Sequence, residues 1–172
     1  FLGPHYLIPT VAEQYRLICT LIDSAAPTIR AQLLEVGTAY AALIGWLHQD
    51  AGNVPQSAYW RSATLDMAHR CENHDLISYA LTNKAMLATD AGNGQAVIDF
   101  GNAALLGKQR QLMPKTQIMA AVQTAHGYSL TGDRAAADRL LDGAARQAAL
   151  VGDDQVWGLS LIHISEPTRQ AE

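Results

Sequence analysis

One short sequence recurs in this chain at an interval of forty residues. Asp50-Ala51-Gly52-Asn53 is repeated as Asp90-Ala91-Gly92-Asn93, and Leu130-Thr131-Gly132-Asp133 follows as a looser copy with its glycine in register. A tight Gly-Asn or Gly-Asp turn that recurs between long segments is typical of stacked helical hairpins, which bury their apolar faces only against neighbouring hairpins. We therefore expect an array whose function lies on a shared surface.

Small residues recur at fixed distances from the three turn glycines. These positions are Gly45, Ala85 and Ala125 before the turns, and Ser57, Val97, Ala137, Thr64, Ala104 and Ala144 after them. Tetratricopeptide-type hairpins need small side chains where their two helices cross. The period of forty, and Arg61 and Gly101 at positions where a bulky apolar residue is usual, depart from the strict motif. The expected fold is an all-α, tetratricopeptide-like, right-handed solenoid of helical hairpins.

Composition also favours helix. Apolar residues make up 49% of the 172-residue chain and aromatic residues only 6%. Alanine and leucine supply much of the apolar content, and both lose little side-chain freedom in a helix. The expected division is an N-terminal helix or partial repeat over 1–27, three hairpins over 28–154, and a truncated fourth repeat with a non-native tail over 155–172.

Local signals place the helix ends. Thr10 and Glu13 form a capping box, which predicts a first helix from Thr10 to about Ile22. Asn53 is expected to cap a helix that has Pro55 in its first turn. The remaining predicted helices span about 28–50, 54–71, 76–91, 94–107, 114–130 and 134–150.

Charge and hydropathy limit the possible partners. The formal net charge is −4, and the basic residues are scattered, so these residues lack the phosphate-binding footprint that nucleic-acid binding requires. The longest apolar stretch, Tyr40–Leu47, is far shorter than a membrane span. Cys19 and Cys71 have no metal-type spacing and are expected to be reduced, buried thiols of a cytoplasmic protein. Because the chain begins at Phe1, we expect it to be part of something longer.

In stacked hairpins of this kind the first helices line a concave groove, and positions facing it can be counted back from each turn glycine. Aromatic, methionine and uncharged polar groups suit an extended peptide, a modest apolar ligand or a partner protein. The alternative is that Trp46 and Met86 simply pack inside the array. The groove residues predicted in this way are Trp46, Gln49, Tyr79, Thr82, Met86, Met119, His126 and Ser129.

The sequence favours binding over catalysis. Asp50 and Asp90 precede equivalent turns, and a bond to a neighbouring hairpin or simple solvation explains them better than a catalytic pair, because the third copy has Leu130. Among the histidines and cysteines only Cys71 and His74 stand three or four residues apart, which is too few ligands for a zinc site. We expect no enzyme activity, no cofactor and no metal. Tyr40, Trp46, Tyr59 and Trp60 form the densest aromatic group, expected to be core, with an interface role as the alternative.

Several of these segments resemble the C-terminal domain of XRE-type helix-turn-helix transcriptional regulators from high-GC bacteria. The resemblance runs from about Ala31 to Leu150. The segments that carry it are Gly45-Trp46-Leu47-His48-Gln49-Asp50, Gly52-Asn53, Tyr59-Trp60, Ala68, residues 85–90, Gly92-Asn93, Ala125-His126-Gly127-Tyr128-Ser129-Leu130 and Gly132-Asp133.

The resemblance implies a domain that senses a ligand or dimerises. In that family an N-terminal DNA-binding domain precedes the repeats, and residues 1–30 here carry no helix-turn-helix pattern. DNA contact is therefore expected only through a missing N-terminal domain, and a homodimer is possible. A stand-alone adaptor that binds a partner peptide in the same groove is the alternative.

The end of the chain has a different character. Residues 160–169 resemble a peptide produced when sequencing-adapter DNA is translated. The alternative is a native C-terminal strap in which Pro167 ends any helix. Neither interpretation gives these residues a function.

Overall fold

The computed structural model describes residues 3–106 and 112–151, which form seven α-helices and no strand. The helices are α1 (Pro4–Ser24), α2 (Pro27–Asp50), α3 (Val54–Arg70), α4 (His74–Asp90), α5 (Gly94–Leu106), α6 (Pro114–Thr131) and α7 (Arg134–Ala148). The all-α prediction is confirmed for this part of the chain. The predicted fourth repeat, from residue 155, lies outside the described residues.

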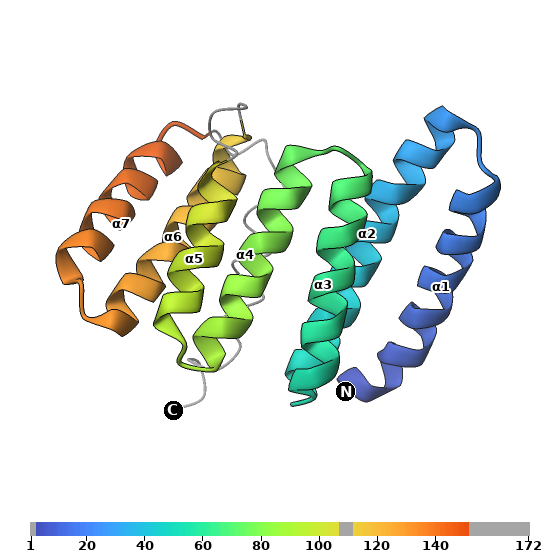
Figure 1. The fold of residues 1–172 in the computed structure, drawn as a ribbon, viewed down its shortest axis with the longest axis horizontal. Helices are drawn as coiled ribbons and strands as arrows, with labels where there is room; N and C mark the ends of the chain where they lie inside the picture. The colour runs from blue at the N-terminus through green and yellow to red at the C-terminus, as the bar shows by residue number, and fades with distance from the viewer. Residues whose placement is uncertain (1–2, 107–111, 152–172) are drawn as a thin grey trace.

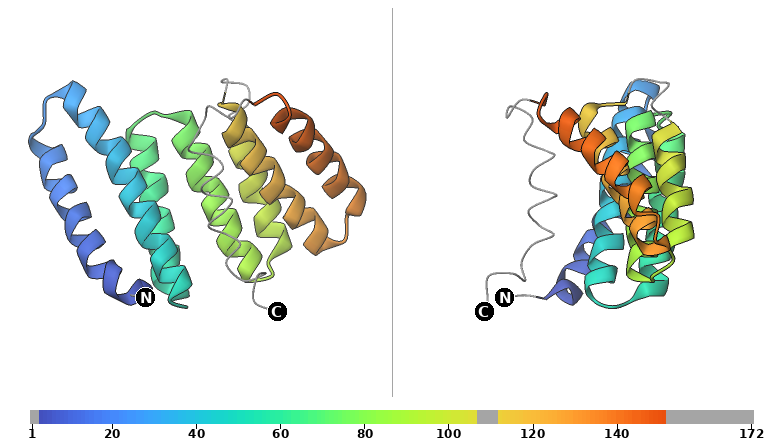
Figure 2. Two further views of the ribbon diagram at one scale, coloured as in Figure 1. Left: turned by 180° about the vertical axis from the view of Figure 1, so that it is seen from behind. Right: turned by 90° about the vertical axis from the view of Figure 1, so that its left-hand side faces the viewer.

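The helices stand in a row in chain order, and neighbours run in opposite directions (Figures 1 and 2). Each helix packs against the next one in the chain. In addition, α2 contacts α4, and α4 contacts α6. The even-numbered helices therefore form a continuous side of the row. No helix within the described ranges is long and apolar enough to cross a membrane.

The three glycine turns are equivalent in space, as the repeat predicts. Gly52, Gly92 and Gly132 have φ of 73°, 67° and 85°, in the left-handed region that side chains with a Cβ disfavour. In each turn the amide of the residue after the glycine donates to the carbonyl five residues back, at 2.8, 2.9 and 2.9 Å. That residue also caps the following helix, with side-chain oxygens accepting from backbone amides at 3.3, 3.1 and 3.0 Å.

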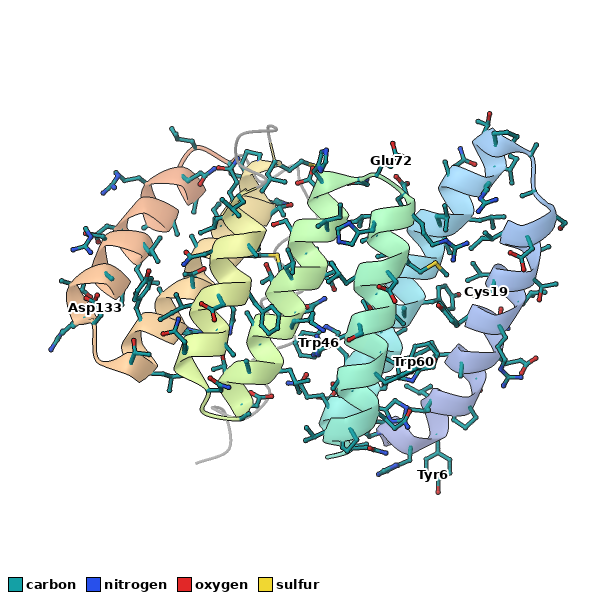
Figure 3. The ribbon with its side chains drawn as sticks, in the orientation of Figure 1. Tyr6, Cys19, Trp46, Trp60, Glu72 and Asp133 are labelled. Atoms are coloured by element: carbon teal, nitrogen blue, oxygen red, sulfur yellow. The ribbon has the colours of Figure 1, made fainter. Side chains whose placement is uncertain are left out.

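A fourth turn of the same kind joins α3 to α4, at the opposite edge of the row (Figure 3). Glu72 has φ of 54° and is the one non-glycine residue with positive φ in the described ranges. Asn73 then caps α4, accepting from the amides of Asp75 and Leu76 at 3.0 and 3.2 Å. Asn73 lies twenty residues after Asn53 and twenty before Asn93. The structural unit is therefore one helix and one turn, which recur here every twenty residues.

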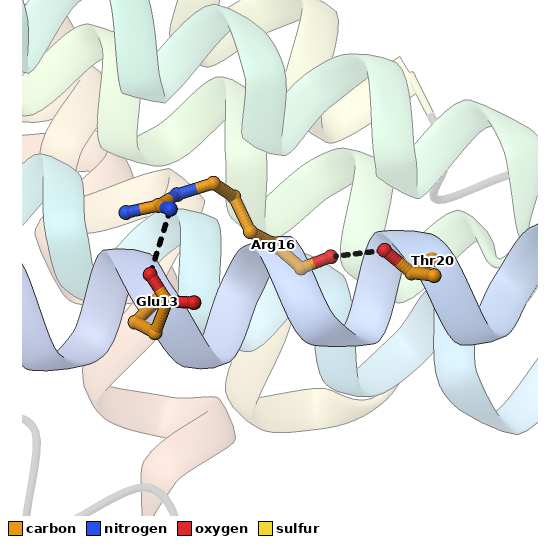
Figure 4. A network of polar contacts seen from close by, with 3 residues as sticks. All are labelled: Glu13, Arg16 and Thr20. Atoms are coloured by element: carbon orange, nitrogen blue, oxygen red, sulfur yellow. Dashed lines mark hydrogen bonds and ion pairs between the residues drawn. The ribbon is translucent and has the colours of Figure 1, made fainter.

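The predicted start of the first helix is wrong. α1 begins at Pro4, so Thr10 lies inside the helix and is not a cap. Glu13 pairs instead with Arg16 at 2.7 Å, and the Arg16 carbonyl accepts from the Thr20 hydroxyl at 3.1 Å (Figure 4). Pro4 suits the first turn, where an amide has no helical partner, whereas Pro9 is accommodated in the helix interior.

The core near the N-terminus is small and contains both cysteines at its edge. Ile18 and Ile22 of α1 pack with Leu34 of α2 and Met67 of α3. Cys19 and Cys71 are free thiols beside this cluster, and they are half-buried where the sequence predicted burial.

Glycine allows α5 and α6 to approach closely. A Cβ added to Gly101 would lie 2.1 Å from the hydroxyl oxygen of Thr124, and one added to Gly127 would lie 2.9 Å from the backbone nitrogen of Ile98. The side chain of Thr124, which is fully buried, thus fills the space that a bulky residue at position 101 would otherwise occupy.

Two alanine substitutions should act in opposite directions on the free energy of unfolding. Gly101→Ala should lower it by about 1–3 kcal/mol through overpacking against Thr124. Gly143→Ala in α7 should raise it by roughly 0.5–1 kcal/mol, because a Cβ there meets nothing closer than 4.0 Å and alanine favours helix. Urea denaturation followed by circular dichroism measures both, and equal effects would contradict the close approach of α5 and α6.

The turn at Glu72 predicts a stabilising substitution. Left-handed backbone costs a residue with a Cβ roughly 1–2 kcal/mol. Glu72→Gly should therefore raise the free energy of unfolding by about 0.5–1 kcal/mol after the added entropy of the unfolded chain is subtracted. Glu72→Ala keeps the strain and is the matched control. If both variants unfold at the same urea concentration, the relief of strain is not the cause.

Candidate functional site

The predicted groove residues lie along α2, α4 and α6, but they differ in exposure. Trp46, Gln49, Tyr79, Met86 and Met119 are half-buried, whereas His126 and Ser129 are exposed. Thr82 is only 2% exposed, and its hydroxyl donates to the Ser78 carbonyl at 2.9 Å. Thr82 therefore belongs to the interior of the array and does not offer its hydroxyl to a ligand in this conformation.

A chain of polar contacts joins α2, α3 and α4. The side-chain amide of Gln49 donates to the carboxylate of Asp90, and its carbonyl oxygen accepts from the guanidinium of Arg61. Gln49 thus links one hairpin to the next. The sequence analysis offered a bond to a neighbouring hairpin as one explanation for Asp90, and the contact with Gln49 is such a bond. This contact favours a structural role for the Asp90 carboxylate.

Arg61 is a buried cation that the sequence only flagged as unusual. Its side chain is 1% exposed, and its guanidinium carbon lies 4.8 Å from the centre of the Trp46 ring, a cation–π contact. Gly45 lies beside it, and a Cβ there would be in ordinary van der Waals contact with Cγ of Arg61, at 3.4 Å. The guanidinium fills the place where an apolar residue was expected.

Burial lowers the pKa of Arg61 to about 10, against the raising effect of Tyr79, Asp90 and Asp50. The group therefore remains protonated at neutral pH. Lys84 is near enough for Arg61 to lower its pKa as well, although burial is the larger cause. The joint between α3 and α4 thus holds two cations.

Several buried polar atoms in these three helices have no hydrogen-bond partner within the described residues. They are the indole nitrogen of Trp46, Nδ1 of His48, Nε and Nη1 of Arg61, both amide atoms of Asn83, and the hydroxyls of Ser57 and Ser78. Unpaired buried polar groups cost free energy. The α2–α3–α4 joint is accordingly the least satisfied polar region of the described chain.

The next joint carries a similar amide bridge. Gln123 of α6 donates to the Thr89 hydroxyl of α4 at 2.6 Å, and Thr89 donates to the Ala85 carbonyl at 3.1 Å. Thr89 holds the position in its helix that Gln49 holds in α2. A glutamine amide therefore bonds α2 to α4, through Gln49, and another bonds α6 to α4, through Gln123.

The aromatic group predicted around the first hairpin divides into two. Trp60 makes edge-to-face contacts with Tyr15 of α1 at 5.0 Å and with Tyr59 at 5.5 Å. Trp46 lies on the α4 side of α3, whereas Trp60 lies on the α1 side (Figure 3). Tyr59 is 63% exposed, which corrects its assignment to the core. Tyr15 is a member that the sequence analysis missed.

A hollow of about 440 Å³ opens between α6 and α7. Two predicted groove residues, His126 and Ser129, line it from α6. Arg134, Asp138 and Leu141 line it from α7. The structure thus brings His126 and Ser129 together, but it places them at the end of the row, away from Trp46, Gln49 and Tyr79 around Arg61.

Within residues 3–106 and 112–151, no three histidine, cysteine or acidic side chains are placed to hold a metal ion. Arg61 is a buried residue beside Trp46 and Gln49 that the groove prediction omitted. The sequence did indicate that Arg61 is unusual, because it is a charged residue at a repeat position that normally faces the core. What the sequence could not give was the pairing with Gln49, which depends on how consecutive hairpins pack.

Comparison with known proteins gave no match to a family model, a curated protein or a solved structure. The resemblance to XRE-type regulators therefore stays a prediction.

The polar chain predicts a non-additive pair of substitutions. Gln49→Leu removes the acceptor of a buried cation and should lower the free energy of unfolding by about 2–3 kcal/mol. Arg61→Met removes the charge itself and should cost less than about 1 kcal/mol. In the double variant the Gln49→Leu penalty should largely vanish.

Urea titration of the four proteins, with Gln56→Leu on the exposed surface of α3 as a control, measures this cycle. Additive effects of the two substitutions would contradict a direct coupling between Gln49 and Arg61.

Proposed function

We propose that this chain is a binding module in which the side formed by α2, α4 and α6 receives a ligand. In the leading version it is the ligand-sensing or dimerisation part of a bacterial, cytoplasmic transcriptional regulator whose DNA-binding domain lies elsewhere in the protein. The fine architecture proposed is a tetratricopeptide-like, right-handed solenoid. Its action is binding and not catalysis, with no cofactor.

The observation that carries the proposal is the recurrence of one turn at the ends of α2, α4 and α6. The three turns have the same hydrogen bonds, and glutamine amides join α4 to both neighbours, from Gln49 of α2 and from Gln123 of α6. We therefore expect Trp46, Met86 and His126, each six residues before a turn glycine, to occupy corresponding places along this side. A row of such positions suits an extended peptide, because bound side chains recur along a peptide at regular distances.

The polar joint supports a sensing role. A ligand changes a protein's conformation only if it binds one conformer more tightly than another. The α3–α4 joint is built from large polar side chains with unpartnered atoms, whereas the α5–α6 joint is a close glycine contact. We therefore expect the angle between α3 and α4, at Arg61 and beside Trp46 and Tyr79, to change at a lower free-energy cost than the angle between α5 and α6.

The second candidate is a stand-alone adaptor that binds a partner's peptide and reads no DNA. The same surface favours both candidates. Sequencing the genomic region upstream of the Phe1 codon separates them, because the regulator requires a helix-turn-helix segment in the same gene. A complete gene without that segment would leave only the adaptor.

Peptide selection tests the shared surface directly. Immobilised chain is panned against a phage library of random twelve-residue peptides, a length that spans about 40 Å when extended. Dissociation constants of the selected peptides are then measured by fluorescence anisotropy. His126→Ala and Met86→Ala should weaken binding at least about tenfold, the effect expected of an anchoring side chain.

The matched control is His69→Ala, which removes an exposed histidine from α3, outside the even-numbered helices. Peptides whose binding changes equally for His126→Ala and His69→Ala do not use the proposed surface. A selection that yields no peptide binding above background would count against peptide recognition.

A further inference from the structure

The side-chain amide of Gln49 is held on both sides by residues of other helices. Its carbonyl oxygen accepts from Nη2 of Arg61 in α3, and its nitrogen donates to the carboxylate of Asp90 in α4. A guanidinium offers only donors, and an ionised carboxylate offers only acceptors. The two residues therefore form a matched donor and acceptor for one carboxamide group, and we call them the Arg61–Asp90 site.

This site has a buried end and an open end. Arg61 is 1% exposed, whereas Asp90 is exposed at the last position of α4 and Gln49 is half-buried. Gln49 is also the residue before the last in α2, so its side chain can turn into water without a change in the helix core. A group from solvent can therefore enter beside Asp90 and replace the Gln49 amide.

The charges at the site favour a neutral group. Burial lowers the pKa of Arg61, but Asp90 and Asp50 act against this effect, so both carboxylates lie near the guanidinium. A ligand carboxylate would bond to Arg61 but would face these two anions, and a ligand ammonium would face the buried cation. Like charges that face each other disfavour association. A primary carboxamide, with one acceptor oxygen and a donor nitrogen, suits both residues of the site.

Gln49 leaves other buried donors at the site without a partner. Nε and Nη1 of Arg61 and the indole nitrogen of Trp46 have none within the described residues. The guanidinium carbon lies 4.8 Å from the centre of the Trp46 ring, so these donors are close together. A ligand with further carbonyl groups beside its carboxamide would make hydrogen bonds that the unbound chain lacks. The main chain of a peptide supplies such carbonyl groups.

We propose that the Arg61–Asp90 site binds an asparagine or glutamine side chain of a peptide ligand, and that Gln49 occupies the site when no ligand is bound. The inference rests on the proposed function, because the peptide must lie on the side formed by α2, α4 and α6. The bound carboxamide takes the two contacts of Gln49, and the main-chain carbonyl groups next to it accept from Arg61 and Trp46.

The proposal predicts that Gln49 opposes ligand binding. An amide tethered beside the site competes with the ligand at a high effective concentration. Gln49→Ala should therefore strengthen peptide binding at least about fivefold. Arg61→Met removes the buried donors and should weaken it at least about tenfold. If Gln49 contacted the ligand directly, Gln49→Ala would weaken binding instead.

Peptides for this test are selected from the same phage library on the wild-type chain and on the Gln49→Ala chain. Asparagine or glutamine should recur at one position of the selected peptides. Each peptide is then synthesised with the carboxamide, with the corresponding acid, aspartate or glutamate, and with leucine at that position. By fluorescence anisotropy the acid should bind the wild-type chain at least about tenfold more weakly than the carboxamide, because it faces Asp90.

Asp90→Asn should reverse this preference. The substitution keeps the size of the side chain and an oxygen that accepts from Gln49, but it removes the nearest anion. The acid peptide should then bind at least as tightly as the carboxamide peptide, because its carboxylate pairs with Arg61. The matched control is Asp99→Asn on the exposed surface of α5, outside the even-numbered helices, which should leave the preference for the carboxamide unchanged.

Weaker binding by the Gln49→Ala chain, or equal binding of acid and carboxamide peptides to the wild type, would overturn the inference. Peptides that depend on His126 and Met86 but ignore every change at Gln49, Arg61 and Asp90 would also overturn it, and the proposed function would still stand. A selection without binders on either chain would contradict both. If circular dichroism shows that Gln49→Ala is unfolded, the acid and carboxamide peptides on the Asp90→Asn chain decide the question.

Discussion

The array depends on a chain reversal in which one residue adopts left-handed backbone and the next caps the following helix. This reversal recurs at Gly52, Glu72, Gly92 and Gly132, and in each the amide of the left-handed residue donates to the carbonyl three residues back in the preceding helix. Because the reversals fix where each helix stops and the next starts, they also fix which side chains meet between neighbours. The glutamine bridges and the close contact of α5 with α6 follow from that register.

Sequence reasoning located the glycine turns and most helix ends because those features depend on a few neighbouring residues. It missed the turn at Glu72, since glutamate does not signal left-handed backbone, although Asn73 stands in register with Asn53 and Asn93. It misplaced the start of α1, because Thr10 and Glu13 satisfy a local capping rule that the helix beginning at Pro4 overrides. It could not foresee that Thr82 is buried or that Arg61 reaches Gln49, since both depend on packing between hairpins.

Arg61 shows how a repeat tolerates a residue that breaks its pattern. The charge is buried, but it is stacked on Trp46, bonded to Gln49 and placed in the field of Asp90 and Asp50. In the next hairpin the same position is Gly101, and the space is filled from the opposite side by Thr124. Equivalent positions of the repeat are therefore filled differently, by a buried guanidinium at Arg61 and by a close contact with Thr124 at Gly101.

This difference has a mechanical consequence. Tightly interlocked backbones resist shear, whereas long side chains with unsatisfied atoms accept water readily when their helices separate. Pulled from its two ends, the row would therefore part first between α3 and α4, into a leading block of three helices and a trailing block of four. The trailing block would move as a rigid unit, so a force or a ligand acting near its turns would be transmitted to the leading block through Gln49.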